Sequence, residues 1–233
     1  MVGATLVEAG DEIAHSTVGL VWDNENNQTN GCSGVLISKR LVLTAAHCFT
    51  AAGKVENLKI TFGLQRDKDH SLQIAASNFL LYGQDHGKSL DDSSIDQEDI
   101  AVVTLSADAP QDYAAVDLIT PNAEINAGDL LTIAGFGSTG ADVKDAGVLR
   151  MAKLTVSAIM DDEHFIRFVE HAFSTEFKGS CFGDSGGPAF LKVDGRSVVA
   201  GIAHGGDYRC RERSLYTDVR PYSAWIKSKI TDT

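Results

Sequence analysis

The stretch Gly183-Asp184-Ser185-Gly186-Gly187-Pro188 constrains the fold and the chemistry of this chain more than any other segment. Glycine has no Cβ, so a serine flanked by glycines can sit on a tight turn with its hydroxyl projecting from the backbone. Such a turn can also aim two amides, those of Gly183 and Ser185, at one point, where convergent N–H groups stabilise a developing oxyanion. Alone, the turn is weak evidence, because Gly-Ser-Gly turns are common in surface loops.

Two upstream segments supply the partners that a serine nucleophile needs. His47 stands in Leu43-Thr44-Ala45-Ala46-His47-Cys48, after an apolar run, and Asp99 opens the strand-like stretch 99–105. A serine hydroxyl is a poor nucleophile, so an imidazole must remove its proton and a carboxylate must orient that imidazole. The order His47, Asp99, Ser185 therefore predicts a catalytic triad for acyl transfer. It argues against an α/β-hydrolase esterase, in which the nucleophile comes first along the chain.

At these residues the chain resembles the chymotrypsin/trypsin family of serine endopeptidases, and the likeness extends over nearly the whole chain. The start, Met1-Val2-Gly3-Ala4, resembles the family's processed amino terminus, 135–137 resembles the opening of its second barrel, and 222–226 looks like its closing helix. The resemblance implies an all-β fold of two six-stranded antiparallel Greek-key β-barrels with a C-terminal helix. It also implies a secreted serine endopeptidase that works through an acyl-enzyme intermediate. The alternative is a latent or catalytically dead binding protein on the same fold, because fold does not dictate activity.

The pattern of the chain alone predicts only an all-β protein. Short β-rich runs alternate with turn residues, which is typical of a sandwich or a barrel. These runs are 17–22, 34–37, 41–43, 58–62, 100–105, 130–134, 153–157, 189–193, 198–202 and 215–219. Apolar residues recur at helical spacing after Pro221. With the resemblance, we expect residues 1–113 to form the barrel of the histidine and the aspartate. Residues 114–233 would form the barrel of the serine and the specificity pocket.

Composition narrows the classes of partner. The chain has 233 residues, 43% of them hydrophobic, which suffices for substantial cores. A net charge of −12 argues against nucleic acid and anionic lipid as partners. No apolar run is long enough to span a membrane, and no signal sequence is recognisable at the amino terminus. We expect a monomer that acts on polypeptide substrates and meets protein protease inhibitors, with the signal and the propeptide not in this chain.

The four cysteines permit three pairings. None shows C-x-x-C spacing, and no histidine cluster along the sequence suggests zinc, so neither a metal nor a cofactor is predicted. The family resemblance selects Cys32–Cys48, around the histidine, and Cys181–Cys210, at the wall of the substrate pocket. Two structural disulfides imply an oxidising compartment, either secreted or periplasmic. Free buried thiols are the alternative.

The resemblance also places the first specificity pocket by counting back from the nucleophile. Its floor, walls and rim would be Gly179 and Ser180, Gly206 and Ser214, and Phe182. An uncharged floor does not support selectivity for Lys or Arg, and small walls favour a medium or large apolar residue before the scissile bond. A slip of one position would place Arg213 in the pocket instead and favour acidic side chains.

Two positions depart from the family's pattern. Members are activated when a newly freed α-amino group, usually of isoleucine or valine, pairs with the acid before the nucleophile, whereas this chain begins with Met1. We expect the amine of Met1, or of Val2 after Met removal, to pair with Asp184, and the pairing to raise its pKa. His204 stands where the family usually has a serine that touches the triad aspartate. It is either a packed histidine satisfied by a carbonyl or a donor that orients Asp99.

Overall fold

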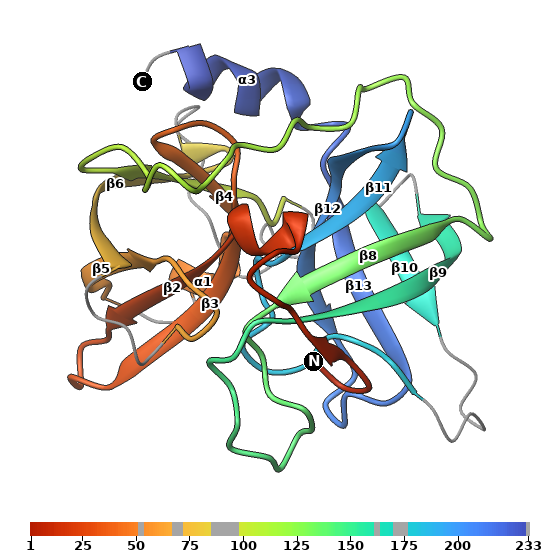
Figure 1. The fold of residues 1–233 in the computed structure, drawn as a ribbon, viewed down its shortest axis with the longest axis horizontal. Coiled ribbons are helices and arrows are strands. Elements are labelled where there is room, and N and C mark those ends of the chain that lie inside the picture. The colour runs from red at the N-terminus through yellow and green to blue at the C-terminus, as the bar shows by residue number, and fades with distance from the viewer. Residues whose placement is uncertain (51–53, 67–71, 85–97, 161–163, 170–176, 232–233) are drawn as a thin grey trace.

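The computed structural model describes residues 1–50, 54–66, 72–84, 98–160, 164–169 and 177–231. Its strands form two antiparallel barrels that lie side by side, with the helix α3 (Ser223–Thr231) across one end (Figure 1). The prediction of two six-stranded β-barrels with a C-terminal helix is therefore confirmed. Within these ranges, no helix is both long enough and apolar enough to cross a bilayer.

The first barrel closes in the order β2-β3-β4-β7-β6-β5. Its strands are β2 (Thr17–Asp23), β3 (Thr29–Leu36), β4 (Leu41–Thr44), β5 (Glu56–Thr61), β6 (Gln73–Leu81) and β7 (Ala101–Leu105). Successive side chains of a strand point to opposite faces, so alternate residues share one face. Val18, Leu20 and Trp22 follow this alternation along β2, and all three are buried in the core.

The second barrel has the order β9-β10-β13-β12-β11-β8, and pairing of β8 with β9 closes it. Its strands are β8 (Leu130–Gly135), β9 (Arg150–Met160), β10 (Phe165–Val169), β11 (Pro188–Val193), β12 (Arg196–Gly206) and β13 (Arg213–Asp218). The two-residue strand β1 (Thr5–Leu6) adds to β9. A 3-10 helix, η1 (Glu12–His15), and the single-turn helix α1 (His47–Thr50) complete the described elements.

Both ends of the chain connect the barrels. The amino-terminal segment runs along the second barrel, where the Val2 backbone pairs with Gly179 through two hydrogen bonds. The carboxyl-terminal segment returns to the first barrel, where the rings of Tyr222 and Trp225 pack edge-on against Tyr82 at centroid distances of 4.8 and 5.3 Å. The division of the chain at residue 113 stays a prediction.

Candidate active site

Two neighbouring strands of the first barrel bring His47 and Asp99 together. β4 and β7 pair so that Thr44 lies opposite Ala101, and His47 begins α1 three residues after β4 ends. Asp99 lies two residues before β7. The two side chains therefore leave adjacent strands at the same end of the barrel. A disulfide joins Cys32 of β3 to Cys48 of α1 and ties the histidine helix to the sheet.

The carboxylate of Asp99 is fully buried and accepts three N–H groups. The Nδ1–H of His47 donates to Oδ2 over 2.7 Å, and the backbone N–H of His47 donates to Oδ1 over 2.8 Å. The Nδ1–H of His204, on β12, donates to the same Oδ2 over 2.7 Å. The sequence left open whether His204 binds a carbonyl or Asp99, and the structure shows the contact with Asp99.

Charges and burial act against each other in this cluster. Burial raises the pKa of Asp99, but the charge of His47 and the hydrogen bonds from His204 and His47 outweigh it and lower the pKa to about 2. Burial lowers the pKa of His47, but the charge of Asp99 and the hydrogen bond to it outweigh burial and raise the pKa. Asp99 is therefore ionised at neutral pH. Since a carboxylate only accepts hydrogen bonds, both imidazoles carry a proton on Nδ1.

The same three side chains are the one group within the described ranges whose His, Cys, Asp or Glu atoms could together hold a metal ion. One ligand atom from each of His47, Asp99 and His204 lies within 4.8 Å of the others. A metal ligand must offer a lone pair, whereas both Nδ1 atoms here point N–H bonds at the carboxylate. The contacts therefore favour a hydrogen-bonded cluster over a metal centre.

The turn that carries Ser185 is held by a residue of the other barrel. Gly183 has a φ of +93°, a conformation that favours glycine. Ser33 of β3 makes two hydrogen bonds to the turn: its hydroxyl donates to Gly183 O over 2.9 Å, and its backbone N–H donates to Ser185 O over 2.8 Å. The same hydroxyl accepts the N–H of Phe136 over 2.9 Å. The N–H groups of Gly183 and Ser185 donate to no other residue that the structure describes. Both are therefore available to an oxygen of a ligand.

Asp184 points away from the turn into a fully buried site. Its carboxylate accepts the N–H groups of Gly137 and Cys181, each over 2.8 Å, and lies 3.0 Å from the amine of Met1. The amine also donates to Ser138 O. Burial lowers the pKa of the Met1 amine and outweighs the opposing charge of Asp184. This direction is the opposite of the rise expected from the pairing alone, because the amine is removed from water when it meets the carboxylate.

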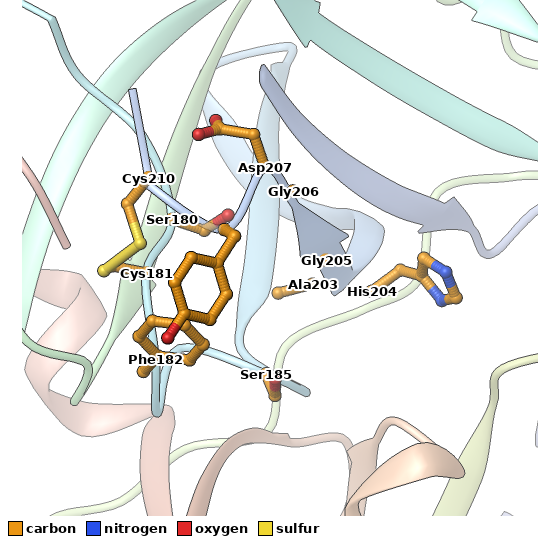
Figure 2. A pocket seen from close by; sticks show the side chains of 11 residues that line it. Ser180, Cys181, Phe182, Ser185, Ala203, His204, Gly205, Gly206, Asp207 and Cys210 are labelled. Atoms are coloured by element: carbon orange, nitrogen blue, oxygen red, sulfur yellow. A yellow bond between two sulfur atoms is a disulfide. The ribbon is translucent and has the colours of Figure 1, made fainter. Parts of the chain in front are cut away.

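A cavity of about 350 Å³ lies beside Ser185. It is lined by Ser180, Cys181, Phe182, Ser185, Ala203, His204, Gly205, Gly206, Asp207, Tyr208 and Cys210. Figure 2 shows the Cys181–Cys210 disulfide on one side of this space and His204 on another, with Ser185 at its edge.

Of the residues expected to form the pocket, three line this cavity: Ser180, Phe182 and Gly206. Ser214 is buried and instead accepts the N–H of Ser180 on its hydroxyl over 2.9 Å. Gly179 pairs with the amino-terminal segment, and a Cβ at this position would come within 2.9 Å of the Ser214 hydroxyl.

Sequence reasoning missed four lining residues, Ala203, Gly205, Asp207 and Tyr208, and the last two carry the side chains that matter most. The carboxylate of Asp207 accepts four backbone N–H groups of the following loop, those of Arg209, Arg211, Glu212 and Arg213. The loop thereby keeps Arg213 exposed and outside the lining of the cavity. The ring of Tyr208 is 83% exposed and meets the half-exposed ring of Phe182 at a centroid distance of 5.7 Å. Neither Asp207 nor Tyr208 stands in a motif, so only the folded loop reveals them.

Comparison with known proteins agrees with the fold. The family model described as Trypsin matches residues 11–226. The chain belongs to the trypsin family. Chymotrypsin-like protease VLCTLP of Macrovipera lebetinus is 27% identical to this trypsin-family domain over 243 residues, covering 97% of this chain and 87% of that protein.

Solved structures share the architecture at lower identity. The structure of GrC superposes with a TM-score of 0.80 at 22% identity, over 99% of this chain and 100% of that one. Human heparin binding protein superposes with a TM-score of 0.76 at 20% identity, over 98% of this chain and 96% of that one. At these identities the likeness concerns the fold alone.

Proposed function

We propose that this trypsin-family protein is a serine endopeptidase that uses His47, Asp99 and Ser185. The observation that carries the proposal is the binding of the buried Asp99 carboxylate to both the side chain and the backbone N–H of His47. These two bonds fix the imidazole with Nδ1 protonated and leave Nε2 as its basic atom. That is the state required of the general base in a serine triad.

The reaction follows from this tautomer. His47 Nε2 takes the Ser185 hydroxyl proton while the oxygen attacks a peptide carbonyl. The N–H groups of Gly183 and Ser185 hold the tetrahedral oxyanion. The imidazolium then protonates the leaving amine, and an acyl-enzyme remains on Ser185. A water molecule loses a proton to His47 and releases the acid product by the same route. The step requires no metal or organic cofactor.

The proposed oxyanion hole depends on the neighbouring acid. Asp184 binds two backbone N–H groups and the Met1 amine, and these contacts fix the backbone on either side of Gly183. We infer that the ammonium–carboxylate pair keeps the turn in its active shape.

We infer a preference for a medium or large apolar residue before the scissile bond. In support, the aromatic rings of Phe182 and Tyr208 flank the cavity, and its one lining carboxylate, that of Asp207, is already bound by four backbone N–H groups. Peptide-library cleavage by the wild type and by Ser185→Ala tests both the activity and the preference. We expect cleavage after apolar residues that is absent in Ser185→Ala. Dominant cleavage after Lys or Arg would overturn the neutral pocket, and equal cleavage by both proteins would overturn the triad.

The competing proposal is a binding protein that has lost or masked its catalytic activity. The likeness to human heparin binding protein, whose name describes binding, is the observation in its favour. It predicts a wild type without hydrolytic activity on any peptide library, however long the incubation. We also place the protein in an oxidising compartment, because its two disulfides would not persist among reducing thiols. We expect it to be a monomer that meets polypeptide substrates and protein inhibitors.

A further inference from the structure

His204 occupies an irregular point of the second barrel. Along β12 and β13, Ala203 lies opposite Tyr216 and Gly205 lies opposite Leu215, so His204 has no residue opposite it. A β-bulge of this kind redirects a side chain out of the regular alternation of a strand. The bulge therefore places an imidazole of the second barrel against the buried aspartate of the first.

The His204 ring is held in a defined orientation. Its Nδ1–H donates to Asp99 Oδ2, and its face lies 4.7 Å from the ring of Phe165, centroid to centroid, at 39°. The rings of His204 and His47 are nearly perpendicular, at 82°, with centroids 5.9 Å apart. The side chain of His204 is 18% exposed and that of Asp99 is not exposed at all. One carboxylate oxygen thus binds two imidazoles from two barrels.

We propose that His204 is a positioning residue that sets the proton affinity of His47 through the shared Oδ2 oxygen of Asp99, and that protonation of His204 adds a second acid step to the loss of activity. This inference rests on the proposed function, since the proton affinity of His47 matters only if His47 is the general base. It goes beyond that function because a neutral hydroxyl at the same position could orient Asp99 but could not titrate.

The balance of charge at Asp99 couples the two imidazoles. In the neutral form, both imidazoles donate from Nδ1 and share a single negative charge. When His47 accepts the Ser185 proton, the full carboxylate charge stabilises the new imidazolium. If His204 is already protonated at Nε2, two cations face one carboxylate, and the His47 imidazolium gains less from it.

Few other charges face this cluster in the described residues. Tyr216 of β13 and Tyr222 have raised pKa values because they are buried, so both phenols are neutral near pH 7. Glu98 precedes Asp99, and its charge acts on Tyr222. Asp207 lines the same cavity, but four backbone N–H groups satisfy it. His164 is exposed beside Phe165 and makes an edge contact with Tyr222.

A pH-rate experiment separates positioning from simple packing. The variant His204→Asn keeps a neutral N–H donor near the place of Nδ1 but cannot titrate, while His204→Ala removes the donor. We expect the acid limb of log kcat/KM to steepen beyond a slope of one in the wild type and to return to one in both variants. In His204→Ala we also expect the midpoint to rise, because the Asp99 charge is then shared by fewer donors. The matched control is His164→Asn, at a φ of +58° that asparagine tolerates, which should leave the limb unchanged.

A spectroscopic experiment needs no turnover. In Ser185→Ala, we expect two strongly deshielded imidazole N–H resonances in the proton NMR spectrum, one from each donor to Asp99. The double variant Ser185→Ala/His204→Asn should retain one of them. A single resonance in Ser185→Ala, or a wild-type acid limb of slope one with the midpoint of His204→Asn, would overturn the proposal. If Ser185→Ala shows two resonances but the wild type cleaves no peptide, the proposed proteolytic function is wrong, whereas the sharing of Asp99 Oδ2 by two imidazoles is supported.

Discussion

The two barrels hold their parts of the site in different ways. In the first barrel, His47 and Asp99 leave adjacent strands and bind each other directly, and the second barrel adds one further donor to Asp99, His204. In the second barrel, the turn of Ser185 depends on residues far away in the sequence, Met1 and Ser33 among them. The first arrangement is set by sheet register and the second by distant segments. Changes remote from the chemistry should therefore affect the nucleophile and its amides more than the base.

The largest expected effect on activity comes from changing Asp99, whose position beside His47 is set by the register of β4 and β7. Asp99→Asn should lower kcat by about 10⁴-fold, because the amide favours the wrong tautomer of His47. The loss should occur with little change in KM, since Asp99 does not line the cavity. Steady-state kinetics measures both values. A loss below about tenfold would mean that Asp99 does not orient the base.

The next effect tests the distant contacts of the turn. Asp184→Asn removes the charge that faces the Met1 amine, and kcat should fall by about 10²–10³-fold, the range seen when one oxyanion donor is lost. The matched control is Asp218→Asn, which breaks a partly buried ion pair with Arg220 at the end of β13. If both variants lose the same activity, general destabilisation explains the result and the special role of Asp184 is wrong.

The third prediction concerns acid stability. The pKa of Asp99 is lowered to about 2 from an ordinary value of 3.8, so its ionised form stabilises the fold above pH 4. That contribution, about 2 kcal/mol, should disappear as the pH falls from about 4 to 2. Denaturant unfolding at a series of pH values measures it. The free energy of unfolding of Asp99→Asn should change less over this interval, and an identical slope in both proteins would contradict the assignment.

The smallest effect comes from the hydroxyl that links the barrels. Ser33→Ala leaves the buried N–H of Phe136 without its partner and frees Gly183 O, so stability should fall by about 1–3 kcal/mol and kcat should fall with it. Ser16→Ala is the matched control, because its buried hydroxyl has no partner among the described residues. The unfolding temperature and kcat should both fall in Ser33→Ala, and this joint fall should be absent in Ser16→Ala. A fall of equal size in both would remove Ser33 from the account of the turn.

Much of the fold is predictable from the sequence, and the failures have physical reasons. Every predicted run overlaps an observed strand, since each is rich in apolar or β-branched residues. β1 escapes prediction because two residues show no periodicity, and β6 because alanine, serine and asparagine interrupt its apolar positions. β10 is a five-residue strand within a long polar stretch, so its short apolar pattern does not stand out.

The site divides in the same way. His47, Asp99 and Ser185 stand in motifs whose residue types reveal their chemistry. Ser33 stands in no such motif, and 150 residues of sequence separate it from Gly183, which its hydroxyl contacts. The sequence alone also does not predict the direction in which the pKa of the Met1 amine shifts, because that direction depends on how completely the amine is buried. What a motif cannot encode is the set of contacts made by unrelated segments after folding.

Labelling with an organophosphorus serine reagent, followed by peptide mapping, tests the central claim most directly, because the reagent reacts with an activated serine and needs no knowledge of the substrate. The account predicts one phosphoryl group per chain, on Ser185, formed at a rate that falls at acid pH and is lost in His47→Ala. A wild type that stays unlabelled at pH 7.5, or that is labelled on another serine, would contradict it.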